Sequence, residues 1–158
     1  MSFQIGDKVI HCVFGLGEIS AIEEKPINGE LTNCYVVKIT DLTIWIPIDD
    51  LQQNSLRLPT PPDEFVKVLP ILSSPNEILV DDRVLRKHQL IEQLRDGQLA
   101  SICRVVRDLT YFQHNSKLND QEKSILERAI NTLLAEWSLS LGMPVNQAHQ
   151  AMESMLQG

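Results

Sequence analysis

Three prolines within four residues most tightly constrain how this 158-residue chain can fold. The segment Leu58-Pro59-Thr60-Pro61-Pro62 can continue neither a sheet ladder nor the interior of a helix, because proline lacks an amide hydrogen and has a fixed φ. The hydrophobic period also differs on its two sides. We therefore predict a junction at residues 59–62, which separates a domain of residues 1–58 from a domain of residues 63–158.

The residues before the junction have the patterns of short strands. Polar and apolar residues alternate over residues 18–22, and Asn28-Gly29 favours the tight turn of a hairpin. Residues 34–39 and 42–48 are rich in β-branched and aromatic side chains. Four or five short strands in this length predict a small, strongly bent antiparallel sheet or barrel.

The residues after the junction have a helical period. Asn119 and Glu122 form a capping-box pattern, Gly142 and Pro144 are stop signals, and the pattern places Ile91 on a buried helix side. Helices are predicted over residues 63–72, 81–95, 99–109, 119–141 and 145–155. Four or five helices predict a compact all-α bundle. The predicted fold class is α+β, with the β-sheet domain first and the helical domain second.

Composition and spacing favour a soluble, cytoplasmic protein that is not an enzyme. No run of about 18 apolar residues is present, and no leader pattern opens the chain. The three cysteines form no CxxC pair, and the four histidines are isolated, so we predict no disulfide framework, metal site or cofactor. His11 and Cys12 are adjacent in a predicted strand and point to opposite faces, which argues against a cysteine-dependent hydrolase.

Charge is distributed unevenly along the chain. The whole chain carries 14 Lys and Arg against 21 Asp and Glu, a net charge of −7, which by itself argues against nucleic-acid binding. Residues 83–107 nevertheless hold six cations against two acids. This basic window is either a surface that contacts phosphates or a solvated helix face with internal pairs, such as Arg104 with Asp108 at i, i+4.

Trp45 lies in a segment whose even-numbered residues form one apolar face. If that face packs into the core, the indole is at least partly exposed and suits an interface anchor. The alternative is that Trp45 packs against the linker or the helical domain. Pro47 in the same segment predicts an edge strand, which can receive a strand from a partner.

Motifs in order along nearly the whole chain resemble the CarD/CdnL family of bacterial transcription regulators. The first half contributes Gly6-Asp7-Lys8-Val9-Ile10, Phe14-Gly15-Leu16-Gly17, Ala21-Ile22-Glu23, Ile27-Asn28-Gly29-Glu30 and Tyr35-Val36-Val37. The second half contributes Glu92-Gln93-Leu94 before Asp96-Gly97, Val105-Val106-Arg107-Asp108-Leu109, and Leu118-Asn119-Asp120 with Glu122-Lys123.

The resemblance implies a monomeric, non-enzymatic regulator of open-complex formation. Its Tudor-like N-terminal module would bind the β subunit of RNA polymerase by adding to a sheet edge, and its helical domain would contact promoter DNA. The implied polymerase-binding residues are Lys25, Pro26, Ile27, Tyr35, Trp45 and Pro47. The basic window supplies the expected DNA-binding residues Arg83, Arg86, Lys87, Arg104 and Arg107.

The chain departs from the family pattern at two kinds of position. Members typically have arginine at the Lys25 and Trp45 positions, so one cation is kept and the other is replaced by an aromatic ring. Family members insert a tryptophan into the minor groove, and the corresponding position in this chain lies near Arg83, where no tryptophan is present. We therefore expect DNA binding to be weak. The alternative function is a protein-interaction module whose helical domain binds another protein and not DNA.

Overall fold

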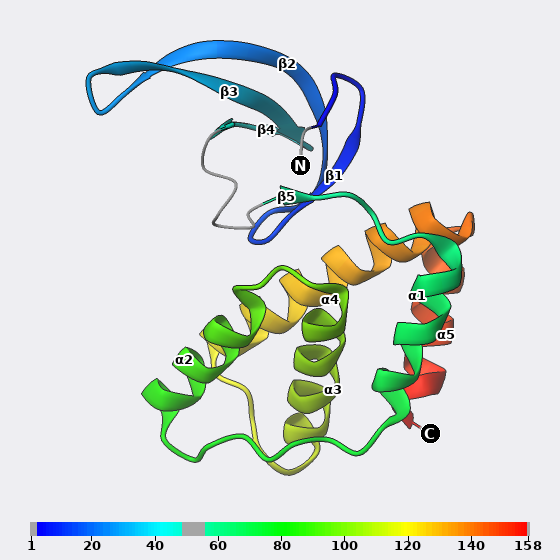
Figure 1. Ribbon diagram of the computed structural model, residues 1–158. Helices are drawn as coiled ribbons and strands as arrows, with labels where there is room; N and C mark the ends of the chain where they lie inside the picture. The colour runs from blue at the N-terminus through cyan, green and yellow to red at the C-terminus, as the bar shows by residue number, and fades with distance from the viewer. Residues whose placement is uncertain (1–2, 49–55, 158) are drawn as a thin grey trace. The chain divides into compact units, whose positions relative to one another are not determined.

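The computed structural model describes residues 3–48 and 56–157. The chain divides into two compact units, Met1–Pro59 and Thr60–Gly158, at a boundary within the proline-rich segment. The first unit is a β-sheet and the second is helical, which confirms the α+β fold class (Figure 1).

The N-terminal unit is a five-stranded antiparallel sheet with the order β4-β3-β2-β1-β5. The strands are β1 (Lys8–His11), β2 (Gly15–Ile27), β3 (Glu30–Ile39), β4 (Leu42–Pro47) and β5 (Leu56–Arg57). The pairing register shifts between Ile19 and Ala21, and the long β2–β3 ribbon is visibly curved (Figure 1). A bulge of this kind bends a strand, in accordance with the predicted strong bend.

Asn28 and Gly29 join β2 to β3 as predicted. Both have positive φ, 52° and 83°, which is the requirement of a two-residue hairpin turn of this type. The strand β5 is absent from the sequence prediction, because two residues are too short to show a period of two.

The sheet packs its inner face around a small apolar core. Its buried members are Phe3, Val9, Ile19, Tyr35, Val37 and Ile39. Ile44, Ile46 and Ile48 pack against this core. The even-numbered face of β4 therefore points inward, which leaves the odd-numbered face outside.

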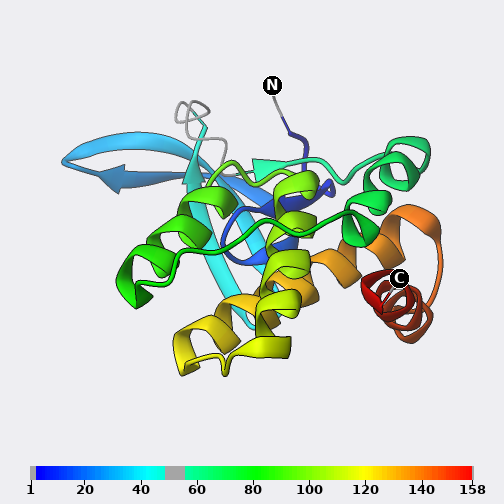
Figure 2. The ribbon, with the colours of Figure 1, turned by 90° about the horizontal axis from the view of Figure 1, so that it is seen from below.

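The C-terminal unit is a bundle of helices. They are α1 (Pro62–Val68), the 3₁₀ helix η2 (Leu69–Ser73), α2 (Arg83–Leu94), α3 (Leu99–Asn115), α4 (Asp120–Leu141) and α5 (Val145–Gln157). Pro62 occupies the first turn of α1, where proline is tolerated because that amide has no helical partner. Within this unit α2 lies toward one end, and α1 and α5 lie toward the other, in both views (Figures 1 and 2).

Local capping signals in the helical unit are confirmed. The Asn119 side chain accepts from the Glu122 amide at 2.8 Å, and the Glu122 carboxylate accepts from the Asn119 amide at 2.9 Å. Gly142 ends α4 in the left-handed conformation, with φ 65°. Asp82 is the N-cap of α2, and its side chain accepts hydrogen bonds from the Val84 and Leu85 amides.

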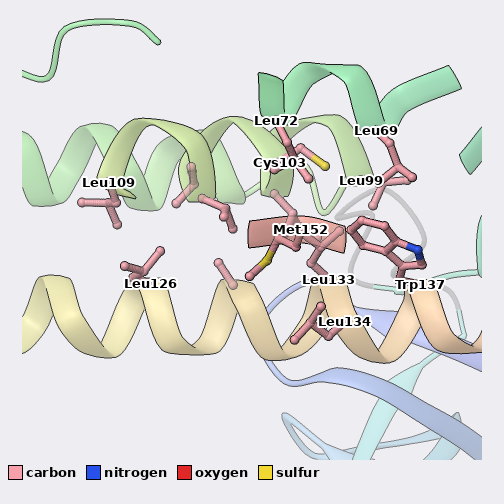
Figure 3. Packing of buried hydrophobic residues seen from close by; sticks show 14 of the residues in the cluster. Leu69, Leu72, Leu99, Cys103, Leu109, Leu126, Leu133, Leu134, Trp137 and Met152 are labelled. Carbon is pink, nitrogen blue, oxygen red and sulfur yellow. The ribbon is translucent and has the colours of Figure 1, made fainter. Parts of the chain in front are cut away.

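The bundle core lies between α3 and α4. Leu109 faces Leu126 at one end of this interface, while Trp137 approaches Leu69 and Met152 at the other (Figure 3). Trp137 is buried and belongs to this core. Among the helices in the described part of the chain, none is long and apolar enough to cross a membrane.

Candidate interaction surfaces

Strand β4 forms one edge of the sheet, as Pro47 predicts. The Ile48 amide donates to the Asn33 carbonyl at 2.9 Å, so Ile48 faces β3. In an antiparallel pair, backbone groups of alternate residues point to opposite sides of a strand. Ile44 and Ile46 therefore bond toward β3, whereas the backbone groups of Thr43 and Trp45 point away from the sheet.

Pro47 belongs to the same outward-facing set as Thr43 and Trp45. A proline at this position costs the sheet no hydrogen bond, because its missing amide hydrogen would point away from β3. The edge of β4 therefore offers the amide and carbonyl groups of Thr43 and Trp45 and only a carbonyl at Pro47. This edge can pair with a short added strand.

Trp45 lies on the outer face of the sheet and is 41% exposed. Its indole nitrogen donates to Glu23 Oε2 at 3.1 Å. The Lys25 ammonium lies 4.7 Å from the indole centroid and 4.0 Å from the same Glu23 oxygen. Within the sheet Trp45 is therefore partly exposed, and its neighbours come from β2.

Pro26 and Ile27 occupy the end of β2, opposite Leu31 and Glu30 of β3. The β2–β3 hairpin continues past the end of β4, because Pro47 of β4 pairs with Cys34 of β3. The structure therefore places Lys25 beside Trp45, whereas Pro26 and Ile27 lie farther along the hairpin.

Tyr35 is not a surface residue. Its side chain is only 2% exposed, its hydroxyl accepts a hydrogen bond from the Phe3 amide at 3.0 Å, and its ring contacts the Phe3 ring edge-on. The expectation that Tyr35 contacts a partner is therefore wrong for this conformation. An aromatic residue in an alternating strand has the same sequence pattern on either face, so the pattern did not reveal its burial.

Arg86 is buried, although the sequence predicted a residue that contacts DNA. It is 7% exposed, and its guanidinium forms a salt bridge with Glu122, which is 1% exposed. It also donates to the Val80 and Asp81 carbonyls at 3.2 and 3.0 Å and lies over the Phe112 ring. With its side chain buried and its Nε and Nη1 groups bonded inside the unit, Arg86 is not available to a DNA phosphate.

The Glu122 carboxylate is stabilised in its charged form. Burial alone would raise its pKa, but hydrogen bonds from Arg86 and the Asn119 amide, together with the charges of Arg86 and Arg83, lower the pKa below its ordinary value. Glu122 therefore serves two elements at once: it completes the capping box of α4 and neutralises the buried arginine of α2.

Arg107 is the second buried cation of the basic window. It is 9% exposed, and its guanidinium donates to Asp108 Oδ1 and to the Ser74 hydroxyl, both at 2.8 Å. The same Asp108 oxygen accepts from the Glu77 amide at 3.0 Å. Asp108 is thus paired with its neighbour Arg107, and the prediction that Arg107 contacts DNA is wrong for the same reason as for Arg86.

Three of the five expected DNA-binding residues are not buried: Arg83 is exposed, and Lys87 and Arg104 are half-buried. Arg95, also in the basic window, pairs with Glu92 at 3.4 Å. The window therefore divides into local ion pairs and a few available cations, and its effective charge is smaller than its composition indicates.

An exposed apolar surface, which the sequence pattern did not predict, lies in and before α2. Ile91, assigned to a buried side by its spacing, is 44% exposed, and it belongs to a larger set. The exposed members are Ile78, Val80, Val84, Leu85 and Ile91. Adjacent apolar residues of a helix can share one core, as Val105 and Val106 do, so the Val84-Leu85 pair did not reveal this surface in the sequence.

The cysteines provide no activated nucleophile. Burial raises the pKa of Cys12 and Cys34, and it raises that of Cys103 to about 12. His11 Nδ1 accepts from the amides of Val13 and Phe14 at 3.0 and 3.2 Å, so this nitrogen is occupied. Within residues 3–48 and 56–157, no three His, Cys, Asp or Glu side chains gather as a metal site would require.

Comparisons with known proteins match both units. Residues 3–58 match the model of the CarD-like/TRCF RID domain, and residues 67–153 match the model of the CarD C-terminal domain. A protein of Bacillus subtilis (strain 168), YdeB, which is named as a candidate transcription factor, is 28% identical over 151 residues, covering 92% of this chain and 96% of that protein. The chain therefore belongs to the CarD/CdnL family of transcription regulators.

Proposed function

We propose that this chain is a non-enzymatic, cytoplasmic regulator that docks on the β subunit of RNA polymerase and modulates open-complex formation. Docking uses the edge of β4, with Trp45 as its anchor and Lys25 beside it. The helical unit contacts promoter DNA weakly through Arg83, Lys87 and Arg104. This assignment is supported by the family of both units and by the geometry of the sheet edge.

The observation that carries the proposal is the uncharged edge strand β4. Proteins usually protect an exposed edge strand with lysines, bulges or a covering segment, because its free amides and carbonyls pair readily with other chains. None of the residues in β4 is charged, and Pro47 at its end is the single protecting feature within the strand. Such an edge, beside an exposed tryptophan, suits docking by strand addition.

A pull-down of the full chain with the polymerase β subunit tests the docking surface. Trp45→Ala combined with Lys25→Glu should abolish capture, because the anchor ring is lost and a second carboxylate is placed beside Glu23. Tyr111→Ala, which removes a similarly exposed ring from α3, is the matched control and should bind normally. Unchanged capture by the double variant would show that docking occurs elsewhere.

Weak DNA contact suits a protein that is brought to the promoter by polymerase. The net charge of −7 repels free DNA at long range, but tethering raises the local concentration enough for a few cations to suffice. Each phosphate contact contributes about −0.9 to the slope of log K against log salt. Arg83→Ala should therefore reduce that slope by about one unit in a fluorescence-anisotropy titration. A slope near zero for the natural chain would contradict phosphate contact.

A second function of the helical unit is favoured by a separate observation. Two of the five expected DNA-binding residues, Arg86 and Arg107, are buried in ion pairs. Val84, Leu85 and Ile91 meanwhile expose apolar surface on α2. In this alternative, α2 binds a protein and not DNA. It predicts no mobility shift even at low salt, and loss of function in Val84→Ser/Leu85→Ser but not in Arg83→Ala.

A further inference from the structure

We propose that Trp45 receives an uncharged, apolar side chain from a partner strand paired with Thr43 and Trp45, and that this docking is insensitive to salt. The inference rests on the proposed function for the identity of the partner, and it adds the register and the chemistry of the contact. The three observations that support it are the direction of the β4 backbone groups, the charges around Trp45 and the order of its side chain.

The register follows from the position of Pro47. An added strand can exchange both amide and carbonyl hydrogen bonds with a residue only where both groups point outward. In β4 that condition holds at Thr43 and Trp45, whereas Pro47 supplies only a carbonyl. Full pairing therefore ends at Trp45, and the partner residues nearest to it have side chains on the outer face beside the indole.

The charges nearest to Trp45 neutralise one another. Glu23 accepts from the indole nitrogen at 3.1 Å and lies 4.0 Å from the Lys25 ammonium, which itself lies 4.7 Å from the ring centroid. A partner charge placed here would lose hydration without gaining a free opposite charge. An apolar group loses no such hydration and gains burial against the indole, so the surface favours an apolar group.

The indole is also held in place before docking. Its hydrogen bond to Glu23 and its contact with Lys25 restrict its rotation, while 41% of the residue stays exposed. A side chain that is already ordered loses little conformational entropy on binding. Trp45 therefore meets the usual description of an interface anchor, a large aromatic group that is partly exposed and fixed.

The test is a binding titration of the full chain with the polymerase β subunit by biolayer interferometry. Between about 50 mM and about 500 mM NaCl, Kd should change by less than about threefold, because an apolar contact forms no ion pair between the two proteins that salt could screen. Trp45→Ala should weaken binding by about 30-fold or more, and Trp45→Phe should retain most of the affinity. Trp45→Arg should weaken binding at every salt concentration, because a cation is desolvated against an apolar group.

A second pair of variants tests the register. Thr43→Pro removes one outward amide without removing a bond to β3 and should weaken binding by about tenfold, while Thr43→Val keeps that amide and should retain most of the affinity. Equal binding by both variants would refute the register. Tighter, salt-sensitive binding by Trp45→Arg would refute the apolar contact and indicate a partner carboxylate. If the natural chain fails to bind at any salt concentration, the proposed function and this inference both fail.

Discussion

Replacing Arg86 by methionine should strongly destabilise the helical unit. The change removes the guanidinium but keeps an unbranched side chain over Phe112. Glu122, 1% exposed, would keep a hydrogen bond from the Asn119 amide but lose its cation, and the Val80 and Asp81 carbonyls would lose a donor. Removing one partner of a buried ion pair typically costs about 3–5 kcal/mol.

The size of this effect can be measured by urea denaturation of the full chain, followed by circular dichroism at pH 7. The free energy of unfolding of the helical unit should fall by about 3–5 kcal/mol in Arg86→Met and by less than about 0.5 kcal/mol in Arg83→Met, the exposed control on the same helix. Adding Glu122→Gln to Arg86→Met should restore part of the loss, because glutamine keeps the capping bond without a buried charge.

The effect of Arg86→Met should also depend on pH in a defined direction. Because the pKa of Glu122 in the folded chain is lowered from 4.5, its ionisation stabilises the fold above that value, and this stability is lost as pH falls through the lower folded pKa. Without Arg86, burial dominates and raises that pKa. The difference in stability between the two proteins should therefore begin to narrow above pH 4.5, as pH falls through the raised pKa of the variant, and narrow further below pH 4.5, as the natural chain loses its own stabilisation. A loss under about 1 kcal/mol at pH 7, or a constant difference down to low pH, would refute the role of the buried pair.

Three further predictions concern other local contacts. Burial lowers the pKa of His11 from 6.5, and its Nδ1 accepts hydrogen bonds from two backbone amides. The N-terminal unit should therefore lose stability as pH falls from 6.5 to the lower pKa of the folded state. His11→Asn should lack this pH dependence in denaturation curves from about pH 8 to about pH 5. Glu136 accepts from the Thr60 amide and hydroxyl at 2.9 and 2.7 Å, so Glu136→Ala should cost about 2–3 kcal/mol by urea denaturation, and an unchanged midpoint would contradict this. Gly17→Ala would place its Cβ 2.6 Å from Ile39 Cγ1 and should lower the Tm of the N-terminal unit, whereas a Tm equal to that of the natural chain would show that the strands yield without cost.

The parts of the fold that the sequence predicts well depend on neighbouring residues. Alternation identifies the inner face of β4, Asn28-Gly29 specifies the hairpin turn, and the Asn119 capping box marks the start of α4. Each of these signals acts within a few residues of the chain, so it is complete in the sequence. The same patterns predict the edge position of β4 from Pro47, because proline is tolerated where no ladder bond is lost.

The candidate surfaces are less predictable, because burial depends on residues far apart in the chain. Glu122 neutralises Arg86 from 36 positions away, and Ser74 binds Arg107 from 33 positions away. Glu23 orients Trp45 from 22 positions away. The sequence by itself determined the two-part α+β organisation, the hairpin turn and the start of α4, through local hydrogen bonding and hydrophobic period. It did not determine every helix end, because α3 continues to Asn115, past the predicted end at residue 109, and the predicted helix 63–72 is α1 followed by the 3₁₀ helix η2. Only the tertiary structure decided which cations are available and how Trp45 is held, because charge pairing and desolvation depend on which distant side chains the fold brings together.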